Sequence, residues 1–390
     1  MKKIVVRIFI ITAFVLSVVL AGCAKTEETA GSAKMVPVSE ESVNREALTD
    51  ESAPQEEDTG DKDADDADAG EAETDTEYLT DLVPAEKAPE RKNLTREERA
   101  RIQEEKGLNI FEKTLEVEGL DRDLDILFIA DSHLSLCDDR DMEVYDKAVF
   151  RYGNMLDANG RPAYQTFHEF VDYANAEKPD LLILGGDIVD SAMMASINFL
   201  QGELKNLSVP YLYVLGNHDF EYGNEYYSKR AYEEFLPRLL EVSHSDKGSH
   251  LYSLGGMYVF AADDSNSQYT EDELAKFKEI CDDGRPVLFV THVPIEPGMG
   301  NTELYDKSIE LFGTDSKGNS RALIGEHSVI PNVTTQEMLD LVLADDSNVF
   351  CVLAGHVHYP HEDLLNENVT QIVTGAAFRS RGVLLHLKAK

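Results

Sequence analysis

The stretch Leu181-Leu-Ile-Leu-Gly-Gly-Asp-Ile-Val-Asp190 joins an apolar run of strand length to two glycines and a carboxylate. The glycines permit a tight turn, so Asp187 is expected at the carboxyl end of a strand. A carboxylate in that position can bridge two metal ions. A lone Gly-Asp pair is more often a plain turn after a buried strand, so the interpretation depends on whether other strands end in the same way.

Four other apolar runs also end in polar side chains. Asp125 to Ala130 leads into Asp131-Ser-His133, Tyr211 to Leu215 into Gly216-Asn-His-Asp219, Val287 to Thr291 into His292, and Val349 to Ala354 into Gly355-His-Val-His358. Helical periodicity lies between them, as in the apolar stripe Phe167, Phe170, Val171 and Ala174. Strands that alternate with helices predict an α/β fold, in which ligands bind beyond the carboxyl ends of the strands.

Local signals place the starts of three helices and one edge strand. The pairs Thr95 with Glu98, Thr270 with Glu273, and Thr334 with Glu337 have the form of capping boxes that open helices. Residues Lys113 to Leu120 alternate in polarity like an edge strand. The globular part is therefore expected to begin near Thr95 with a short helix and a strand.

The polar clusters contain seven side chains that suit divalent cations. A single histidine among them would more often be a turn or core residue, but together they form a nitrogen and oxygen donor set. The candidates are Asp131, His133, Asp187, Asn217, His292, His356 and His358. No thiolate accompanies them, which argues against a structural zinc cluster and favours Mn, Fe or Zn in an open catalytic site. Seven ligands shared by two ions leave open positions.

These motifs, taken in order, resemble the calcineurin-like metallophosphoesterase superfamily over roughly Leu124 to Lys390. The motifs are Asp-x-His, Gly-Asp-x-x-Asp, Gly-Asn-His-Asp, a single His and Gly-His-x-His. The resemblance implies a two-sheet sandwich with helices on both outer faces, a four-layer α/β fold. It also implies the division of ligands: Asp131, His133 and His358 on one metal, Asn217, His292 and His356 on the other, and Asp187 between them.

The resemblance further implies hydrolysis of a phosphate monoester or diester. Two divalent ions in such sites lie roughly 3.5 to 4 Å apart, and a bridging hydroxide would be the nucleophile. His218, beside the ligand Asn217, would contact the phosphate and protonate the leaving oxygen, with Asp219 orienting its ring. Asp190 stands where purple acid phosphatases carry tyrosine, so a ferric tyrosinate site is not expected. The Gly-Asp-x-x-Asp form resembles the branch with class III cyclic-nucleotide phosphodiesterases, without fixing a substrate.

The N-terminus has the charge order of a secretory signal. Three basic residues, the last of them Arg7, precede an apolar run from Ile8 to Leu20 that is short for a membrane span. The sequence Leu20-Ala-Gly-Cys23 resembles the lipobox of bacterial lipoproteins, which predicts a signal peptide over 1–22, a lipid on Cys23 and an extracytoplasmic protein anchored to the cell membrane. An ordinary cleaved signal or a bare membrane anchor is the alternative.

An acidic linker is expected to follow over 23–94, ahead of a phosphoesterase domain over 95–390. Between Glu46 and Asp81 there are sixteen carboxylates against Lys62 alone, which predicts an extended, disordered tether; an acidic binding tail is the alternative. This stretch holds 15 of the 38 net negative charges, so the rest of the chain carries the other 23. So acidic a protein is not expected to bind a nucleic-acid polymer.

Two features leave their roles open. The segment 294–331, with the aromatics Tyr305 and Phe312, is either the substrate rim or a solvent loop. Arg379 and Arg381 either reach a phosphate or face water. The substrate is expected to be a phosphorylated small molecule or a component of the cell envelope. A catalytically inactive lipoprotein that recognises a phosphorylated ligand is the alternative function, and loss of a metal ligand would favour it, but none of the seven is lost.

Overall fold

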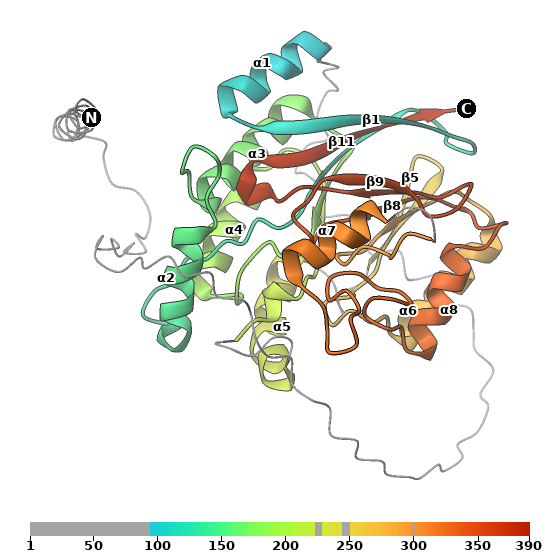
Figure 1. The fold of residues 1–390 in the computed structure, drawn as a ribbon. Helices are drawn as coiled ribbons and strands as arrows, with labels where there is room; N and C mark the ends of the chain where they lie inside the picture. The colour runs from blue at the N-terminus through green and yellow to red at the C-terminus, as the bar shows by residue number, and fades with distance from the viewer. Residues whose placement is uncertain (1–93, 223–227, 244–249, 299–301) are drawn as a thin grey trace, which may run out of the picture. The chain divides into compact units, whose positions relative to one another are not determined.

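The computed structural model describes residues 94–222, 228–243, 250–298 and 302–390. The predicted signal peptide, Cys23 and all but the last residue of the predicted linker lie outside these residues. In the described part, two mixed β-sheets face each other and helices cover their outer faces (Figure 1). The predicted α/β sandwich is therefore confirmed.

The first sheet has the strand order β1-β11-β2-β3-β4. Its strands are β1 (Asn109–Val117), β2 (Leu124–Ile129), β3 (Leu181–Gly185), β4 (Tyr211–Val214) and β11 (Arg381–Ala389). Strands β2, β3 and β4 are parallel, β11 is antiparallel to β2, and β1 pairs with β11 in parallel. The predicted edge strand is thus β1, which begins four residues before the expected Lys113.

The second sheet has the strand order β5-β6-β7-β8-β10-β9. Its strands are β5 (His250–Leu254), β6 (Met257–Ala261), β7 (Val287–Val290), β8 (Val349–Ala354), β9 (His361–Leu364) and β10 (Thr370–Val373). The four central strands are parallel and the two edge strands run antiparallel to their neighbours. The motif strands β7 and β8 are therefore neighbours here, as β2, β3 and β4 are in the first sheet.

Eight α-helices occur in the described residues. They are α1 (Arg96–Lys106), α2 (Tyr145–Asn154), α3 (Ala163–Glu177), α4 (Met194–Asn206), α5 (Lys229–Ser243), α6 (Glu271–Asp283), α7 (Glu303–Phe312) and α8 (Val333–Val342). Three short 3-10 turns add Met142–Val144, His218–Phe220 and Ala377–Arg379. None of the helices in this part of the chain is long and apolar enough to cross a membrane.

Three apolar clusters define the layers. Side chains of α3, α4 and α5 pack on the outer face of the first sheet, where Phe167 and Phe235 belong to the same apolar cluster as Leu184. The inner faces of the two sheets meet in a second cluster, which contains the buried Cys351. Helices α6 and α8 cover the second sheet, where Phe277 joins the third cluster. Burying these apolar surfaces is the main stabilisation of such a fold.

The helix starts partly match the sequence predictions. Thr95 and Thr270 form complete capping boxes at the starts of α1 and α6. The predicted box at Thr334 is wrong, because Asn332 is the N-cap of α8 and its side chain accepts from the amide of Thr335. Asparagine caps a helix at least as well as threonine, so the helix begins earlier than expected. The segment 294–331 also contains helix α7.

Candidate metal centre

The predicted ligands meet where the five motif strands end. Asp131 and His133 follow β2, Asp187 follows β3, Asn217 follows β4, His292 follows β7, and His356 and His358 follow β8. Nitrogen Nε2 of His133 lies 3.0 Å from Nε2 of His358, and Nδ1 of His356 lies 3.3 Å from Nε2 of His292. Donors from both sheets therefore converge on one site, as the parallel strand ends predict.

Three groups of donors can be distinguished, of which two consist of predicted ligands alone and the third joins His133 to Asp190 and His218. The donor atoms of Asp131, His133 and His358 lie within 4.8 Å of one another, and so do those of Asp187, His292 and His356. Oδ2 of Asp187 lies 3.1 Å from Nε2 of His292 and 3.9 Å from Nε2 of His133. The Asp187 carboxylate is thus placed between the two groups, where a bridging ligand would have to lie.

The backbone is strained at most of these positions. Five predicted ligands have φ between 49° and 67°, in the left-handed region that residues other than glycine rarely adopt. They are Asp131, His133, Asp187, His356 and His358. Each such residue costs on the order of 1 to 3 kcal/mol. Five of the seven predicted ligands therefore accept an unfavourable backbone so that their side chains point into one site.

Unpaired oxygen atoms show that the site suits cations. Oδ2 of Asp187 and Oδ1 of Asn217 are buried and make no well-aligned hydrogen bond in the described residues, and the nearest charge partner of Oδ2 of Asp187 among them is the predicted ligand His292, at 3.1 Å. A buried acceptor without a partner is costly, so these two atoms call for a ligand that accepts their lone pairs. Together with imidazole nitrogens, they form a donor set that fits Mn, Fe or Zn.

Neighbouring groups orient the donors. Nδ1 of His133 donates to Oδ1 of Asp190 at 2.9 Å, and Nδ1 of His292 donates to the carbonyl of Gly185 at 2.9 Å. In both rings this leaves Nε2 to face the site. Gly186 has φ 90°, and a Cβ there would lie 2.3 Å from Nδ1 of His292. Only glycine therefore lets the chain after β3 pass so close to the ring.

Burial and charge set the protonation of the site. Burial favours the neutral form of Asp187, but the surrounding histidines, His292 foremost, lower the pKa of its carboxyl well below the usual value. Burial also opposes a charge on His292, yet Asp187 and Asp131 raise its pKa to about 10. Burial and the charge of His292 lower the pKa of His356 to about 3. A cation would therefore compete with a proton for Nε2 of His292.

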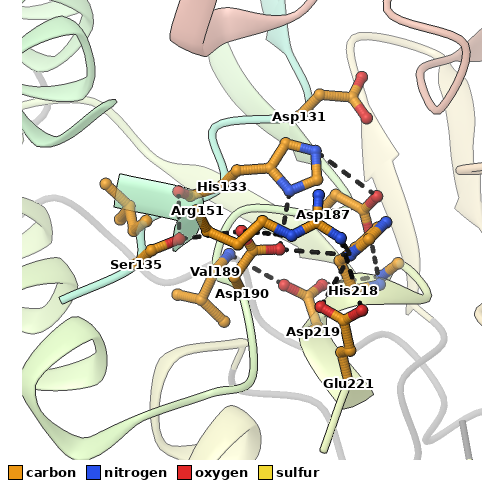
Figure 2. Close-up of polar contacts among 12 residues, drawn as sticks. Asp131, His133, Ser135, Arg151, Asp187, Val189, Asp190, His218, Asp219 and Glu221 are labelled. Carbon is orange, nitrogen blue, oxygen red and sulfur yellow. Dashed lines mark hydrogen bonds and ion pairs between the residues drawn. The ribbon is translucent and has the colours of Figure 1, made fainter. Parts of the chain in front are cut away.

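His218, the predicted proton donor, lies beside the donors with its side chain 16% exposed. Its Nδ1 is 3.2 Å from Oε2 of Glu221 and 3.3 Å from Oδ1 of Asp190 (Figure 2). Burial opposes its charge, but Glu221, Asp187 and Asp190 outweigh that effect and raise the pKa of His218 well above the usual value. The surrounding carboxylates therefore favour the protonated ring, with Nδ1 turned toward them.

The predicted orientation of this ring by Asp219 is wrong. The carboxylate of Asp219 accepts from the amides of Val189 and Gly216 at 3.0 and 2.8 Å and from the Tyr213 hydroxyl at 2.9 Å. Three hydrogen-bond donors in or near the turns after β3 and β4 thus fix the side chain of Asp219. The side chain of Asp219 points away from that of His218 because residues 218–220 form a 3-10 turn, in which successive side chains point in different directions.

Sequence patterns missed a group of charged residues around His218. Glu221 is fully buried and forms ion pairs with Lys147 and, at 3.5 Å, with Arg151, both on α2. Nη2 of Arg151 also lies 3.4 Å from Nδ1 of His218. The position of Glu221 three residues after His218 was a usable signal, whereas α2 lies about seventy residues earlier in the sequence and offered none.

Arg379 and Arg381 are exposed, and neither forms an ion pair or hydrogen bond with a predicted ligand in the described residues. The guanidinium of Arg379 lies 5.1 Å from the ring of Phe378. That ring packs edge-on against His133 and His358, at 5.8 and 5.3 Å. The turn after β10 therefore contacts the site through Phe378, whose ring lies next to both the ligand histidines and Arg379.

Comparison with known proteins gives one family and several relatives. The family described as "Calcineurin-like phosphoesterase" matches residues 124–360. A "Probable cyclic nucleotide phosphodiesterase" of Fibrobacter succinogenes is 29% identical over 117 residues, covering 30% of this chain and 42% of the relative. A "Probable glycerophosphodiester phosphodiesterase GpdQ" of Arcobacter nitrofigilis is 26% identical over 226 residues, covering 54% of this chain and 67% of the relative.

Solved structures give weaker similarities. A dimetal phosphatase from Danio rerio aligns with 66% of this chain and 88% of its own, at 14% identity and a TM-score of 0.41. The chain also spans less than half the length of the Fibrobacter relative. The family match, which covers residues 124–360, is therefore the strongest of these similarities.

Proposed function

Because the chain belongs to the calcineurin-like phosphoesterase family, we propose that it hydrolyses phosphodiesters with two divalent metal ions. The observation that carries this proposal is the position of Asp187, whose buried Oδ2 lies 3.1 Å from His292 in its own donor group and 3.9 Å from His133 in the other. The two relatives are named as phosphodiesterases, which favours a diester over a monoester.

The predicted ligands can be assigned to two metal ions at such a centre. Asp131, His133 and His358 would hold one ion, Asn217, His292 and His356 the other, and Asp187 both. Bound there, divalent ions stabilise charge on a phosphoryl group and generate a nucleophile from water near neutral pH. The strained backbone and the hydrogen bonds to Asp190 and Gly185 hold the donors in place before the substrate arrives.

His218 supplies the proton in this proposal. Its Nδ1 faces Glu221 and Asp190, so Nε2 would be the nitrogen that protonates the leaving oxygen. The same carboxylates stabilise the imidazolium form before the reaction, as the raised pKa of His218 indicates. Arg151 adds a second cation next to this ring.

A panel of substrates tests the activity. Metal-stripped protein is reloaded with Mn, Fe, Zn or Mg and assayed on matched diesters and monoesters. We expect turnover only after loading, with diesters preferred. Asp187→Asn removes the shared charge, so it should abolish turnover and release much of the metal. Full activity of that variant would refute the two-metal assignment, and a wild-type protein that binds metal and phosphate without turnover would point to the inactive binding lipoprotein.

We also propose that the protein is a lipoprotein outside the cytoplasm. The support is the sequence Leu20-Ala-Gly-Cys23, which lies outside the described residues. Labelling of cells with a fatty-acid probe should mark the wild-type protein and leave Cys23→Ser unmarked. Absence of label on wild type, together with fractionation as a soluble protein, would overturn this part of the proposal while leaving the chemistry untouched.

A further inference from the structure

Helix α7 is fastened to the loop that carries two of the predicted ligands. Its residue Leu304 is fully buried in a small apolar cluster with Ala354 of β8 and with Val357. Val357 lies between His356 and His358, so α7 packs directly on the ligand loop. Figure 1 shows α7 beside the end of β8.

Polar contacts fix the same helix at two more points. The hydroxyls of Ser308 and Ser320 lie 2.6 Å apart, both buried, and the Tyr359 hydroxyl donates to Glu303 at 3.0 Å. Tyr359 directly follows the ligand His358. These contacts hold α7 at its first residue, through Tyr359 next to the ligand loop, and in its second half, through Ser320.

That last residue, Phe312, places its ring on the metal centre. Its ring is nearly parallel to that of His356, with centroids 5.9 Å apart and an angle of 10°, and it meets the ring of His358 edge-on at 6.2 Å. Yet Phe312 is 38% exposed, and its neighbour Leu311 is 47% exposed. Phe378 already packs on His358 from a buried position, 2% exposed. His358 therefore already has a buried aromatic neighbour, whereas the ring that stacks on His356 is partly exposed to solvent.

We propose that Phe312 is the wall of a substrate subsite, which binds an aromatic or apolar ester group of the phosphoester held at the metal centre. This inference rests on the proposed function, and it names the class of substrate. The open ring can stack on a flat ester group, and aromatic pairs of this kind add affinity beyond the area that they bury.

Local charge argues against a charged ester group at the same place. Helix α7 carries Glu303, Asp306 and Glu310 against Lys307 alone, and Lys307 is 2.9 Å from Glu310. A second anionic group on the substrate would face this acidic helix without a free cation on it. A neutral aromatic or apolar group meets no such repulsion, so it is the better occupant.

Binding of two phosphonates tests the subsite without turnover. Phenylphosphonate and methylphosphonate are titrated into metal-loaded wild type, Phe312→Ala and Phe312→Leu by calorimetry, with the adjacent Leu311→Ala as the control. We expect wild type to prefer phenylphosphonate roughly tenfold. Phe312→Ala should lose that preference with methylphosphonate binding unchanged, Phe312→Leu should keep part of it, and Leu311→Ala should keep most of it.

The outcomes separate this inference from the proposed activity. Equal weakening of both phosphonates in Phe312→Ala, or loss of bound metal, would show that the ring only supports the ligands and would overturn the subsite. An unchanged preference would overturn it as well. If wild type shows the preference and Phe312→Ala loses it, but no phosphoester is turned over, the subsite stands and the proposed hydrolysis fails.

Discussion

At the scale of single residues, geometry separates side chains that are neighbours in sequence. His218 and Asp219 are adjacent, yet the first faces Glu221 and Asp190 near the donors while the second holds the turns below them. Their substitution should therefore have different consequences, and each can be measured separately.

The His218→Ala variant should keep its metal and lose catalysis. The ring is placed to donate a proton and lies outside the two groups formed by the predicted ligands, while its ring nitrogen joins donor atoms of His133 and Asp190 in a third group. Removal of a general acid lowers kcat by roughly 10² to 10⁴, least for leaving groups that are already weak bases. We expect a nitrophenyl ester to be slowed less than an alkyl ester, with metal content unchanged. Equal slowing of both would make His218 a phosphate contact only.

The Asp219→Asn variant should lose stability. Asparagine keeps one acceptor oxygen, which can still accept from Val189 and Tyr213, but its amide nitrogen cannot accept from the Gly216 amide, which is left without its acceptor. A buried donor left unpaired costs about 1 to 3 kcal/mol, which urea denaturation can measure. The dependence of rate on the leaving group should stay as in wild type. If that dependence changed as in His218→Ala, Asp219 would act on the proton donor after all.

At the scale of secondary-structure elements, the capping residues decide where each helix begins. The complete boxes at α1 and α6 follow the predicted Thr-x-x-Glu pattern, but α8 begins at a different cap. Both patterns were present before α8, because Asn332 and Thr334 are each good N-cap residues. Only the structure shows which of the two residues is the N-cap of α8.

Substitution of the two rival caps of α8 should give unequal effects. Asn332→Ala removes the side chain that accepts from the Thr335 amide, at a cost of about 1 kcal/mol. Thr334→Ala lies within the first turn and should change the free energy of unfolding by less than about 0.5 kcal/mol. Denaturant unfolding of both variants makes the comparison. A larger loss for Thr334→Ala would restore the sequence-based boundary.

At the scale of the whole molecule, the sequence was most informative where strands end together. The polar residues after five apolar runs could be assigned to one site because parallel strand ends meet at one edge. The pairing of Glu221 with Lys147 and Arg151 could not be foreseen, since it depends on how α2 folds back over the site. The stacking of Phe312 on His356 likewise depends on the packing of α7.

The contribution of two buried carboxyl groups, Glu273 and Asp263, to stability should fall as pH rises through the weakly acidic range. Burial raises the pKa of Glu273 to about 7 and that of Asp263 to about 6. The folded state therefore holds these protons more tightly than the unfolded chain, whose carboxyls titrate near pH 4. This stabilisation is complete below about pH 4 and is lost by about pH 7, on the order of 3 kcal/mol for Glu273 alone.

Glu273→Gln should flatten that slope in metal-free protein, measured as the free energy of unfolding at pH 4.5, 6 and 7.5. Glutamine can keep only part of the hydrogen bonding to Thr270 and Asp263, so the absolute stability should fall as well. The slope is the deciding quantity. An unchanged slope would mean that Glu273 is ionised in the folded protein throughout this range.

The dinuclear centre is the claim on which the function depends, and anomalous scattering from crystals of the manganese-loaded protein tests it most directly. The account predicts two anomalous peaks, one next to Asp131, His133 and His358 and one next to Asn217, His292 and His356, with the Asp187 carboxylate between them. A single peak, or two peaks that do not share Asp187, would contradict it.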